Sequence, residues 1–298
     1  MTHNENLVHR VHTEADHSAL KDLIEEVYAH DHIAPISEGY MRILEGKAPG
    51  DLEEIRVDDQ RAGLVITDEE GVAEFFVAPV FRNRGVGQQI ARGIHEMWAH
   101  GDLAPAQKIA ARLNLNKTRE LLVMEIDGEN LAGAVSFKLE HGLRFEHMQP
   151  NDPHGDLEFL RVNNEAFDWH PEQGGWDQTR LDSARSAAWF RYEDVLLLKK
   201  GSELIGFHWL KRHGNLDEGA PGEIYVVGLA TAGRGRGLGG PLVAAGLQHL
   251  VSQGAQRVIL YVESDNEPAV RRYREMGFEI IERHVVYRQT EGRTKALT

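Results

Sequence analysis

A short segment rich in arginine and glycine, Arg234 to Gly240, has the residue types needed to hold a diphosphate. It reads RGRGLGG and stands between a β-prone apolar run and a helical pattern. Glycines let a backbone approach an anion closely, and a helix start offers free N–H groups and the positive end of the helix dipole. Two arginines add positive charge. We therefore interpret this segment as a diphosphate cradle.

Three other interpretations of the segment are weaker. A flexible glycine-rich turn explains the glycines, but not their place between a strand and a helix. A P-loop needs GxxxxGK followed by Ser or Thr, and no such residues follow here. A dinucleotide fingerprint usually opens a βαβ unit, whereas this segment comes after at least three predicted strands.

The same pattern occurs twice in the chain. Arg84-Gly85-Val86-Gly87 matches Arg236-Gly237-Leu238-Gly239 at an offset of 152 residues (236 minus 84). That offset is too long for a solenoid repeat, and 298 residues suffice for two domains that each bury a core. We expect two domains of one fold, residues 1–140 and 141–298, with a boundary near Glu140 to Gly142.

The second half predicts an α/β arrangement in which helices pack on a mixed sheet. Helical patterns cover residues 158–167, 238–253 and 267–276. Strand patterns cover residues 195–200, 203–212, 224–230, 257–262 and 278–288, and Gly201-Ser202 makes a hairpin of the first two. The first half follows the same order less clearly.

Composition narrows the classes of function. Hydrophobic residues make up 41% and charged residues 27%, as is typical of a globular protein. No apolar run approaches the roughly 18 residues of a membrane helix, and the first residues have no apolar core like that of a signal peptide. The net charge of −14 is opposite to that of a nucleic-acid-binding surface. We expect a cytoplasmic monomer with no nucleic-acid or membrane partner.

Metal and thiol chemistry is not expected. The chain has no cysteine, which excludes disulfides, thiolate metal sites and a cysteine nucleophile. Its 16 histidines form no HExxH motif, and His30-x-His32 is an isolated pair. We therefore predict no metal site.

The Arg-Gly segment resembles the pyrophosphate motif of the GNAT acetyltransferases. Arg234-x-x-Gly237-x-Gly239 matches that motif, and so does Arg82-x-x-Gly85-x-Gly87. The string LYVESDNEPAVRRYREMGF, residues 260–278, is similar to the GNAT segment in which an Asn opens a helix that carries a Tyr. The resemblance implies acetyl-CoA as co-substrate. It also implies two tandem GNAT (acyl-CoA N-acyltransferase) domains, each a mixed, mostly antiparallel sheet flanked by helices.

Further strings resemble the mycothiol synthases, a tandem-GNAT family. They are IAPISE (33–38), WAHGDL (98–103), LRVNNEAF (160–167), HPEQGGW (170–176), GFHWLK (206–211), GEIYVVG (222–228) and LYVESDN (260–266). The resemblance implies transfer of an acetyl group to the cysteine amine of a cysteinyl-glucosaminyl-inositol, giving mycothiol and CoA. It also implies a catalytic second domain and a first domain that binds acetyl-CoA without catalysis.

The resemblance assigns two catalytic roles. Glu223 is expected to be the general base, acting through water, and Tyr273 the general acid. A phenol, with an ordinary pKa of about 10, keeps its proton yet can donate it to a thiolate, whose acid has a pKa of about 8.5. The structural alternatives are a solvated strand-end carboxylate at Glu223 and aromatic packing at Tyr273. The implied acceptor-binding residues are Glu38, Glu172, Lys211, Glu223 and Tyr261.

The implied cofactor contacts follow the two motifs. In the second half they are Val227, Gly228, Leu229, Arg234, Gly235, Arg236, Gly237, Leu238, Gly239, Gly240, Asn266, Glu267, Pro268, Ala269, Val270 and Arg271. In the first half they are Phe75, Phe76, Val77, Asn83, Arg84, Gly85, Val86, Gly87 and Gln88. A glycine inside a strand, such as Gly228, often marks a bulge or a close backbone approach. Such a splay leaves an N–H to face the thioester oxygen.

Two alternatives stay open. The chain could be a GNAT enzyme for another amine, such as an aminoglycoside, a polyamine or a protein N-terminus, although HPEQGGW and GFHWLK argue against this. It could also be a non-catalytic acetyl-CoA-binding module. The presence of both Glu223 and Tyr273 argues against that for the second half. The first half has no Tyr in residues 107–126, which favours it there.

Overall fold

The computed structural model describes residues 8–12, 17–168 and 173–289. The chain divides into two compact units. The first comprises residues 1–122, 263–265 and 282–298, and the second comprises residues 123–262 and 266–281. The first changeover between the units lies within β6 (Leu115–Asp127), which contributes residues to both. The division of roles between residues 1–140 and 141–298 stays a prediction.

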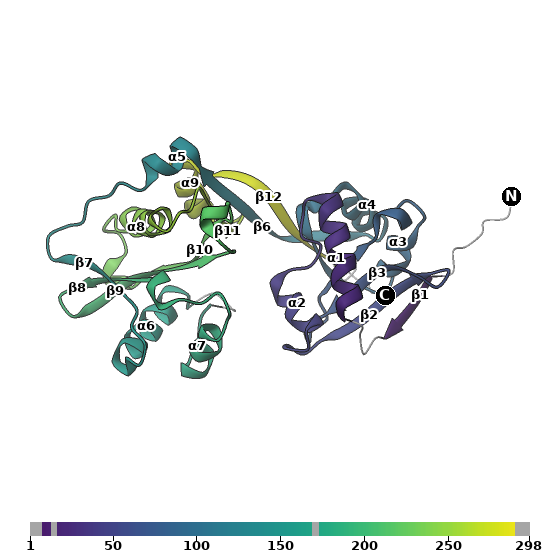
Figure 1. Ribbon diagram of the computed structural model, residues 1–298, viewed down its shortest axis with the longest axis horizontal. Helices are drawn as coiled ribbons and strands as arrows, with labels where there is room; N and C mark the ends of the chain where they lie inside the picture. Colours follow the sequence, from purple (N-terminus) through teal and green to yellow (C-terminus); the bar gives the residue numbers. More distant parts are fainter. Residues whose placement is uncertain (1–7, 13–16, 169–172, 290–298) are drawn as a thin grey trace, which may run out of the picture. The chain divides into compact units, whose positions relative to one another are not determined.

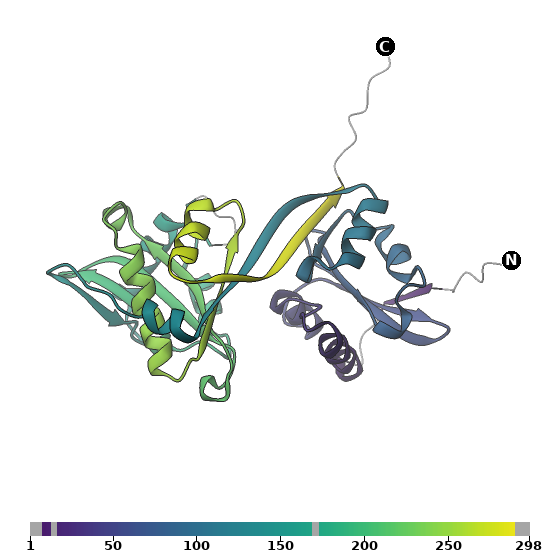
Figure 2. The same cartoon turned by 90° about the horizontal axis from the view of Figure 1, so that it is seen from above.

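The first unit is a mixed sheet with helices on both faces. Its strands β1 to β4 pair antiparallel in order, β4 pairs parallel with β5, and β5 pairs antiparallel with β12. In Figure 2, α1 and α2 lie on one face of this sheet and α3 and α4 on the other. The elements are β1 Val8–His12, α1 His17–Asp31, α2 Glu38–Leu44, β2 Asp51–Val57, β3 Gln60–Thr67, β4 Ala73–Val77, α3 Val86–Ala91, β5 Glu96–Ala99, α4 Ala104–Arg112 and β12 Glu279–Gln289.

The second unit repeats this plan. Strands β7 to β10 pair antiparallel in order, and β10 pairs parallel with β11. Helix α8 covers one face of β9 and β10 and α6 covers the other, as Figure 1 shows. The elements are α5 Gly128–Ala134, β7 Leu143–His147, α6 Pro153–Ala166, α7 Gln178–Arg185, β8 Val195–Lys200, β9 Glu203–Arg212, β10 Gly222–Leu229, α8 Gly239–Ser252, β11 Arg257–Glu263 and α9 Glu267–Glu275.

These elements confirm the predicted fold, a mixed and mostly antiparallel sheet flanked by helices in each unit. The hairpin at Gly201 has the predicted strand bounds. Helix α6 begins at Pro153, five residues earlier than predicted (158 minus 153), because Asp152 caps it by accepting a hydrogen bond from the Gly155 N–H. Strand β7 was not predicted. Within the described ranges, no helix has the length and apolar character needed to cross a membrane.

The core of the second unit is aromatic on the α6 side. Phe159 of α6 packs on Phe207 and Trp209 of β9, with ring centroids 4.6 and 5.9 Å apart. All three side chains are buried. This packing fixes β9 against α6, and β9 in turn holds β10 in register. The strand that leads to the Arg-Gly segment is therefore set on a rigid layer.

Candidate active site

Strands β10 and β11 separate soon after they meet. They pair only over Gly222–Ile224 and Val258–Leu260, and the register of β10 against β9 shifts between Ile224 and Val226. The bulged residue is thus Tyr225, three positions before Gly228. A bulge bends its strand and leaves part of the ladder unpaired. The remainder of β10 is then open to a ligand on the β11 side.

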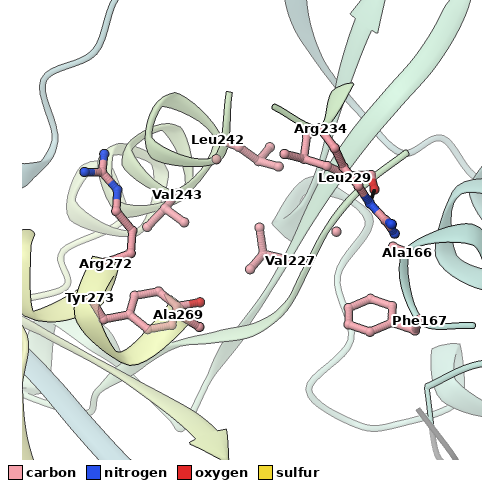
Figure 3. A pocket seen from close by; sticks show the side chains of 12 residues that line it. Ala166, Phe167, Val227, Leu229, Arg234, Leu242, Val243, Ala269, Arg272 and Tyr273 are labelled. Atoms are coloured by element: carbon pink, nitrogen blue, oxygen red, sulfur yellow. Dashed lines mark hydrogen bonds between the residues drawn. The ribbon is translucent and has the colours of Figure 1, made fainter. Parts of the chain in front are cut away.

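A cavity of about 330 Å³ lies at this opening. The predicted cofactor residues Val227, Gly228, Leu229, Arg234, Gly239 and Ala269 line it, together with Ala166, Phe167, Leu242, Val243, Arg272 and Tyr273. Figure 3 shows Val227 and Tyr273 facing the same space, with the Tyr273 hydroxyl directed into it. Most of the wall is apolar, which suits the pantetheine arm of an acyl-CoA.

Gly228 is a site of close approach. A Cβ atom at this position would lie 3.0 Å from Ala166 Cβ, 3.0 Å from Phe207 Cε1 and 3.3 Å from Phe167 Cε2. Helix α6 therefore packs directly on the β10 backbone here. The glycine is explained by this contact, while the irregularity in pairing belongs to Tyr225.

The Arg-Gly segment has the backbone shape of an anion cradle. Gly235 and Gly237 have φ angles of 71° and 73°, which L side chains rarely adopt. Helix α8 follows, and its N-cap residue Leu238 makes no side-chain capping bond among the described residues. The first N–H groups of the 14-residue helix are therefore available for a phosphate. Leu238 itself is buried, so only its backbone can serve a ligand.

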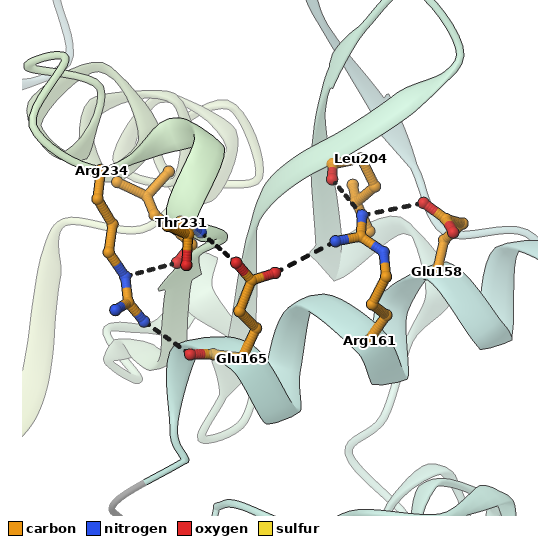
Figure 4. A network of polar contacts seen from close by, with 7 residues as sticks. Glu158, Arg161, Glu165, Leu204, Thr231 and Arg234 are labelled. Atoms are coloured by element: carbon orange, nitrogen blue, oxygen red, sulfur yellow. Dashed lines mark hydrogen bonds and ion pairs between the residues drawn. The ribbon is translucent and has the colours of Figure 1, made fainter.

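The two arginines of this segment make contacts within the protein. Arg234 donates from Nε to the Leu229 carbonyl oxygen at 3.2 Å and from Nη2 to the Glu165 carbonyl oxygen at 2.7 Å (Figure 4). The Glu165 carboxylate accepts from the Thr231 N–H at 2.6 Å, and its contact with Thr231 lowers its pKa. Arg236 pairs with Glu140 at 2.7 Å. These contacts fix the shape of the Arg-Gly segment and the positions of its two positively charged side chains.

Tyr273 lies on α9, which begins as predicted. The Asn266 side chain accepts from the Ala269 N–H at 3.3 Å, and Pro268 lies in the first turn. The Tyr273 ring packs edge-on against Phe278 at 5.6 Å while lining the cavity. Burial raises the pKa of Tyr273 to about 12, so the hydroxyl is protonated at neutral pH. Packing and proton donation are therefore compatible roles.

Glu223 lies near the start of β10, and 4% of it is exposed. Its Oε2 is 2.6 Å from Nε2 of His213. The Cα of Glu223 is paired with Lys211 of β9 and with Ile259 of β11. Tyr261 lies two residues beyond Ile259, so its side chain is on the same sheet face. The predicted acceptor residues Lys211, Glu223 and Tyr261 therefore share one face of three adjacent strands.

Lys211 is buried against aromatic rings. Its Nζ lies 4.9 Å from the Trp189 ring centroid and 5.8 Å from that of Tyr225, within the range of cation–π attraction. Tyr225 is 36% exposed and Tyr261 is 45% exposed. This face thus combines a cation, a carboxylate and accessible phenols, which suits a polyhydroxylated ligand.

The structure does not test two of the predicted acceptor residues. Glu172 lies outside the described residues. Glu38 opens α2 in the first unit and is exposed. Of the remaining predicted cofactor contacts, Val270 is buried, while Glu267, Pro268 and Arg271 lie on the exposed side of α9.

The first unit contains a second cavity of about 410 Å³. Every predicted contact of that half except Arg84 lines it, namely Phe75, Phe76, Val77, Asn83, Gly85, Val86, Gly87 and Gln88. The Arg84 guanidinium lies over the Phe81 ring at 5.6 Å. Strands β4 and β5 pair only at Ala73–Met97 and Glu74–Trp98, so this cavity also lies where two parallel strands separate.

The first unit's equivalent helix has no tyrosine at the position of Tyr273. Tyr273 is the seventh residue of α9, and the seventh residue of α4 is Ala110, which is buried. Leu103, at the N-cap of α4, makes no side-chain capping bond within the described chain. Helix α3 has six residues, against 14 in α8. Of these two helix pairs, the second unit's members thus carry the tyrosine and the longer helix after the Arg-Gly segment.

Several residues of the site were not anticipated. Phe167 and Arg272 line the cavity, and His213 contacts Glu223. Phe167 is part of the LRVNNEAF string, and the family resemblance of that string could have indicated this residue. His213 follows GFHWLKR directly, and the alternation of a strand places it on the Lys211 face.

Comparisons with known proteins give a consistent result. The family model described as "Acetyltransferase (GNAT) family" matches residues 163–278. The chain is similar to the mycothiol acetyltransferase of Corynebacterium efficiens, with 47% identity over 89% of this chain and 90% of that protein. It is also similar to that of Mycobacteroides abscessus, with 38% identity over 88% and 92%.

Solved structures resemble the fold. A GCN5-related N-acetyltransferase from Sphaerobacter thermophilus superposes with a TM-score of 0.70 at 18% identity, covering 96% of each chain. A tandem GNAT protein from the clavulanic acid biosynthesis pathway gives 0.67 at 18% identity, covering 94% of this chain and 98% of that one. At these identities the likeness concerns the fold alone.

Proposed function

The chain belongs to the mycothiol acetyltransferase family of GNAT enzymes and is an N-acetyltransferase, and from this premise we propose its reaction in detail. The acetyl group of acetyl-CoA passes to the cysteine amine of cysteinyl-glucosaminyl-inositol, giving mycothiol and CoA. The observation that carries the proposal is the position of Tyr273 in the wall of a cavity that is also lined by Arg234 and Gly239 of the Arg-Gly segment.

Acetyl-CoA is proposed to lie along the open part of β10. The N–H groups that begin α8 hold its diphosphate, and the apolar wall from Val227 to Leu229 takes the pantetheine. A backbone N–H freed by the splay of β10 and β11 donates to the thioester carbonyl oxygen. Such a donor stabilises the negative charge that develops on that oxygen during attack. Orientation of both reactants supplies a further part of the rate.

Glu223 and Tyr273 divide the proton transfers. Glu223 takes a proton from the acceptor ammonium through water, which frees the nitrogen lone pair for attack on the thioester carbon. When the carbon–sulfur bond breaks, Tyr273 donates its proton to the sulfur, and the second proton lost by the nitrogen as the amide forms restores the phenol. Glu223 lies on β10 and Tyr273 lies on α9, and both elements begin near the point where β10 and β11 separate. Neither role requires a covalent bond to the enzyme.

Acceptor recognition is assigned to the face that carries Lys211, Glu223 and Tyr261. The hydroxyls of a sugar and an inositol are donors and acceptors at once, so carboxylate, ammonium and phenol groups all find partners among them. Glu38 and Glu172 are proposed to complete this set. We propose that the enzyme acts as a monomer in the cytoplasm and that the first unit binds acetyl-CoA without turnover.

The direct test is mass spectrometry of the acceptor after incubation with protein and acetyl-CoA. Fragmentation must place a single acetyl group on the cysteine nitrogen. The matched control is Glu223→Gln, which keeps the shape and is expected to lower kcat/KM by about 10²–10⁴-fold. Acetyl-CoA binding without product formation would contradict the proposed acceptor and leave a GNAT enzyme for another amine. Binding of two acetyl-CoA molecules per chain tests the role of the first unit.

A further inference from the structure

The contact between His213 and Glu223 joins a buried carboxylate to solvent. Their Nε2 and Oε2 atoms are 2.6 Å apart, and the side chains are 29% and 6% exposed, respectively. An ionised carboxylate only accepts hydrogen bonds, so Nε2 carries a hydrogen in this pair and Nδ1 is the nitrogen that gains or loses a proton. The His213 backbone N–H donates to the Pro221 carbonyl oxygen at 3.1 Å, which holds the residue at the end of β9.

We propose that His213 is a positioning residue that orients the Glu223 carboxylate and releases to solvent the proton removed from the acceptor amine. This rests on the proposed role of Glu223 as base. The reaction releases one proton per turnover, because an ammonium and a thioester become an amide, a thiol and H⁺. Because Nε2 already carries a hydrogen, the protonated Glu223 carboxyl passes its proton through water to Nδ1, and the ring holds it as an imidazolium beside the ionised carboxylate. Release of the Nδ1 proton to solvent then returns the pair to its starting state.

The neighbouring groups favour the imidazole for this task. The ionisable side chains near Glu223 on this sheet face include Lys211, His213, Tyr225 and Tyr261. The alternation of β11 also places Arg257 and Glu263 on this face, where Arg257 pairs with Glu125 and Glu263 with Arg119. Lys211 is an ammonium held over two rings, and a phenol ordinarily loses its proton only near pH 10. The imidazole of His213 is 29% exposed, and it has a second nitrogen, Nδ1, besides the one that contacts Glu223. It is thus the group of this set placed to pass a proton to water.

The variant His213→Gln separates the two proposed roles of His213, which are to orient the Glu223 carboxylate and to release a proton to solvent. The glutamine amide nitrogen can still donate to Glu223 but cannot titrate. We expect kcat/KM at pH 7 to fall about tenfold, the midpoint of the acid limb in the profile of kcat/KM against pH to move, and acetyl-CoA affinity to stay within twofold. A profile that matches the wild type in slope and midpoint would overturn the proposal.

Chemical rescue gives a second readout. In His213→Ala the carboxylate loses its donor, and added imidazole should restore the rate in proportion to its concentration. The same imidazole should leave Glu223→Ala inactive, because that variant lacks the base itself. Absence of rescue in a folded His213→Ala protein that binds acetyl-CoA would contradict proton release by this residue.

A substrate-free measurement keeps this inference separate from the proposed function. In the nuclear magnetic resonance spectrum of the wild type, the Nε2 proton of His213 should be visible and protected from exchange with water. It should disappear in Glu223→Ala. Persistence of the signal there would show that the pair does not form, whatever acceptor the enzyme uses. Failure to acetylate the proposed acceptor, with the signal behaving as expected, would count against the reaction alone.

Discussion

Arg82 and Arg234 make equivalent contacts in the two units. The Nε atom of each donates to the carbonyl oxygen of the last residue of the preceding strand, Val77 at 2.9 Å and Leu229 at 3.2 Å. Their terminal nitrogens then reach the first long helix of the same unit, at Asp31 in α1 and at Glu165 in α6. The first arginine of the motif thus ties strand, turn and helix together.

Replacement of Arg234 by lysine tests this structural role. A lysine keeps the charge but cannot bridge two carbonyl oxygens in a fixed plane. We expect a loss of about 1 kcal/mol in the free energy of unfolding and weaker acetyl-CoA binding, because the turn loosens. Urea unfolding and calorimetric titration measure the two effects. Arg236→Lys is the control, since Arg236 makes a surface ion pair and should change stability by less.

The variant Tyr273→Phe tests the proposed role of Tyr273 as general acid, because the substitution removes only the hydroxyl group. The phenyl ring keeps the packing on Phe278, so stability and acetyl-CoA affinity should change little, while kcat falls about 100-fold. Since the pKa of Tyr273 is raised to about 12 by burial, its hydroxyl stays protonated throughout an ordinary assay range. The wild-type rate should therefore show no decline from this group up to pH 10. A variant with wild-type kcat would remove Tyr273 from the mechanism.

The variants Gly228→Ala and Gly235→Ala should both lose stability, but for different physical reasons. A methyl group at Gly228 meets α6 and the Phe207 ring, and overpacking of this kind costs about 1–3 kcal/mol. At Gly235 no atom lies within 4 Å of the added Cβ, but φ is 71°. That variant should lose about 1 kcal/mol through backbone strain and more of its acetyl-CoA affinity. Thermal unfolding and binding titrations on both proteins distinguish the two.

Acid should destabilise the second unit through His208. Burial lowers the pKa of this imidazole to about 4, against about 6.5 in an unfolded chain. Between these values the unfolded chain binds a proton that the folded chain does not. Stability is therefore complete above pH 6.5 and falls by about 3 kcal/mol as the pH drops to 4.

The control for this prediction is His208→Asn. Its amide can keep the contact that His208 Nδ1 makes with the Leu242 carbonyl oxygen at 3.0 Å, but it does not titrate. The variant should be less stable at pH 7 and should lose less stability than the wild type on acidification. Urea unfolding at several pH values measures the difference. Parallel pH profiles for the two proteins would contradict the assignment.

Local signals predicted much of the fold. The alternation and turn at Gly201 gave the hairpin, and Asn266 with Pro268 gave the start of α9, because each depends on residues only a few positions apart. The duplicated Arg-Gly segment identified two units of one fold. The place of the bulge was not predictable, since Tyr225 has no residue type that favours one and the shift arises from pairing with β9.

Contacts between distant segments account for the rest. The pairing of β12 with β5 joins Val285 to Ala99, which periodicity alone does not reveal. Strand β7 was missed because LRFEH is short and half-exposed, so its apolar pattern is weak. Arg234 was expected to add charge to the cradle, and its hydrogen bonds to Leu229 and Glu165 depend on a turn geometry that sequence does not specify.

The return of β12 to the first unit has a consequence for biosynthesis. Residues 282–289 are translated after the whole of the second unit, yet they complete the sheet of the first unit beside β5. The first unit therefore stays incomplete while the second is translated, and a chain cut before residue 282 leaves β5 without the partner strand β12.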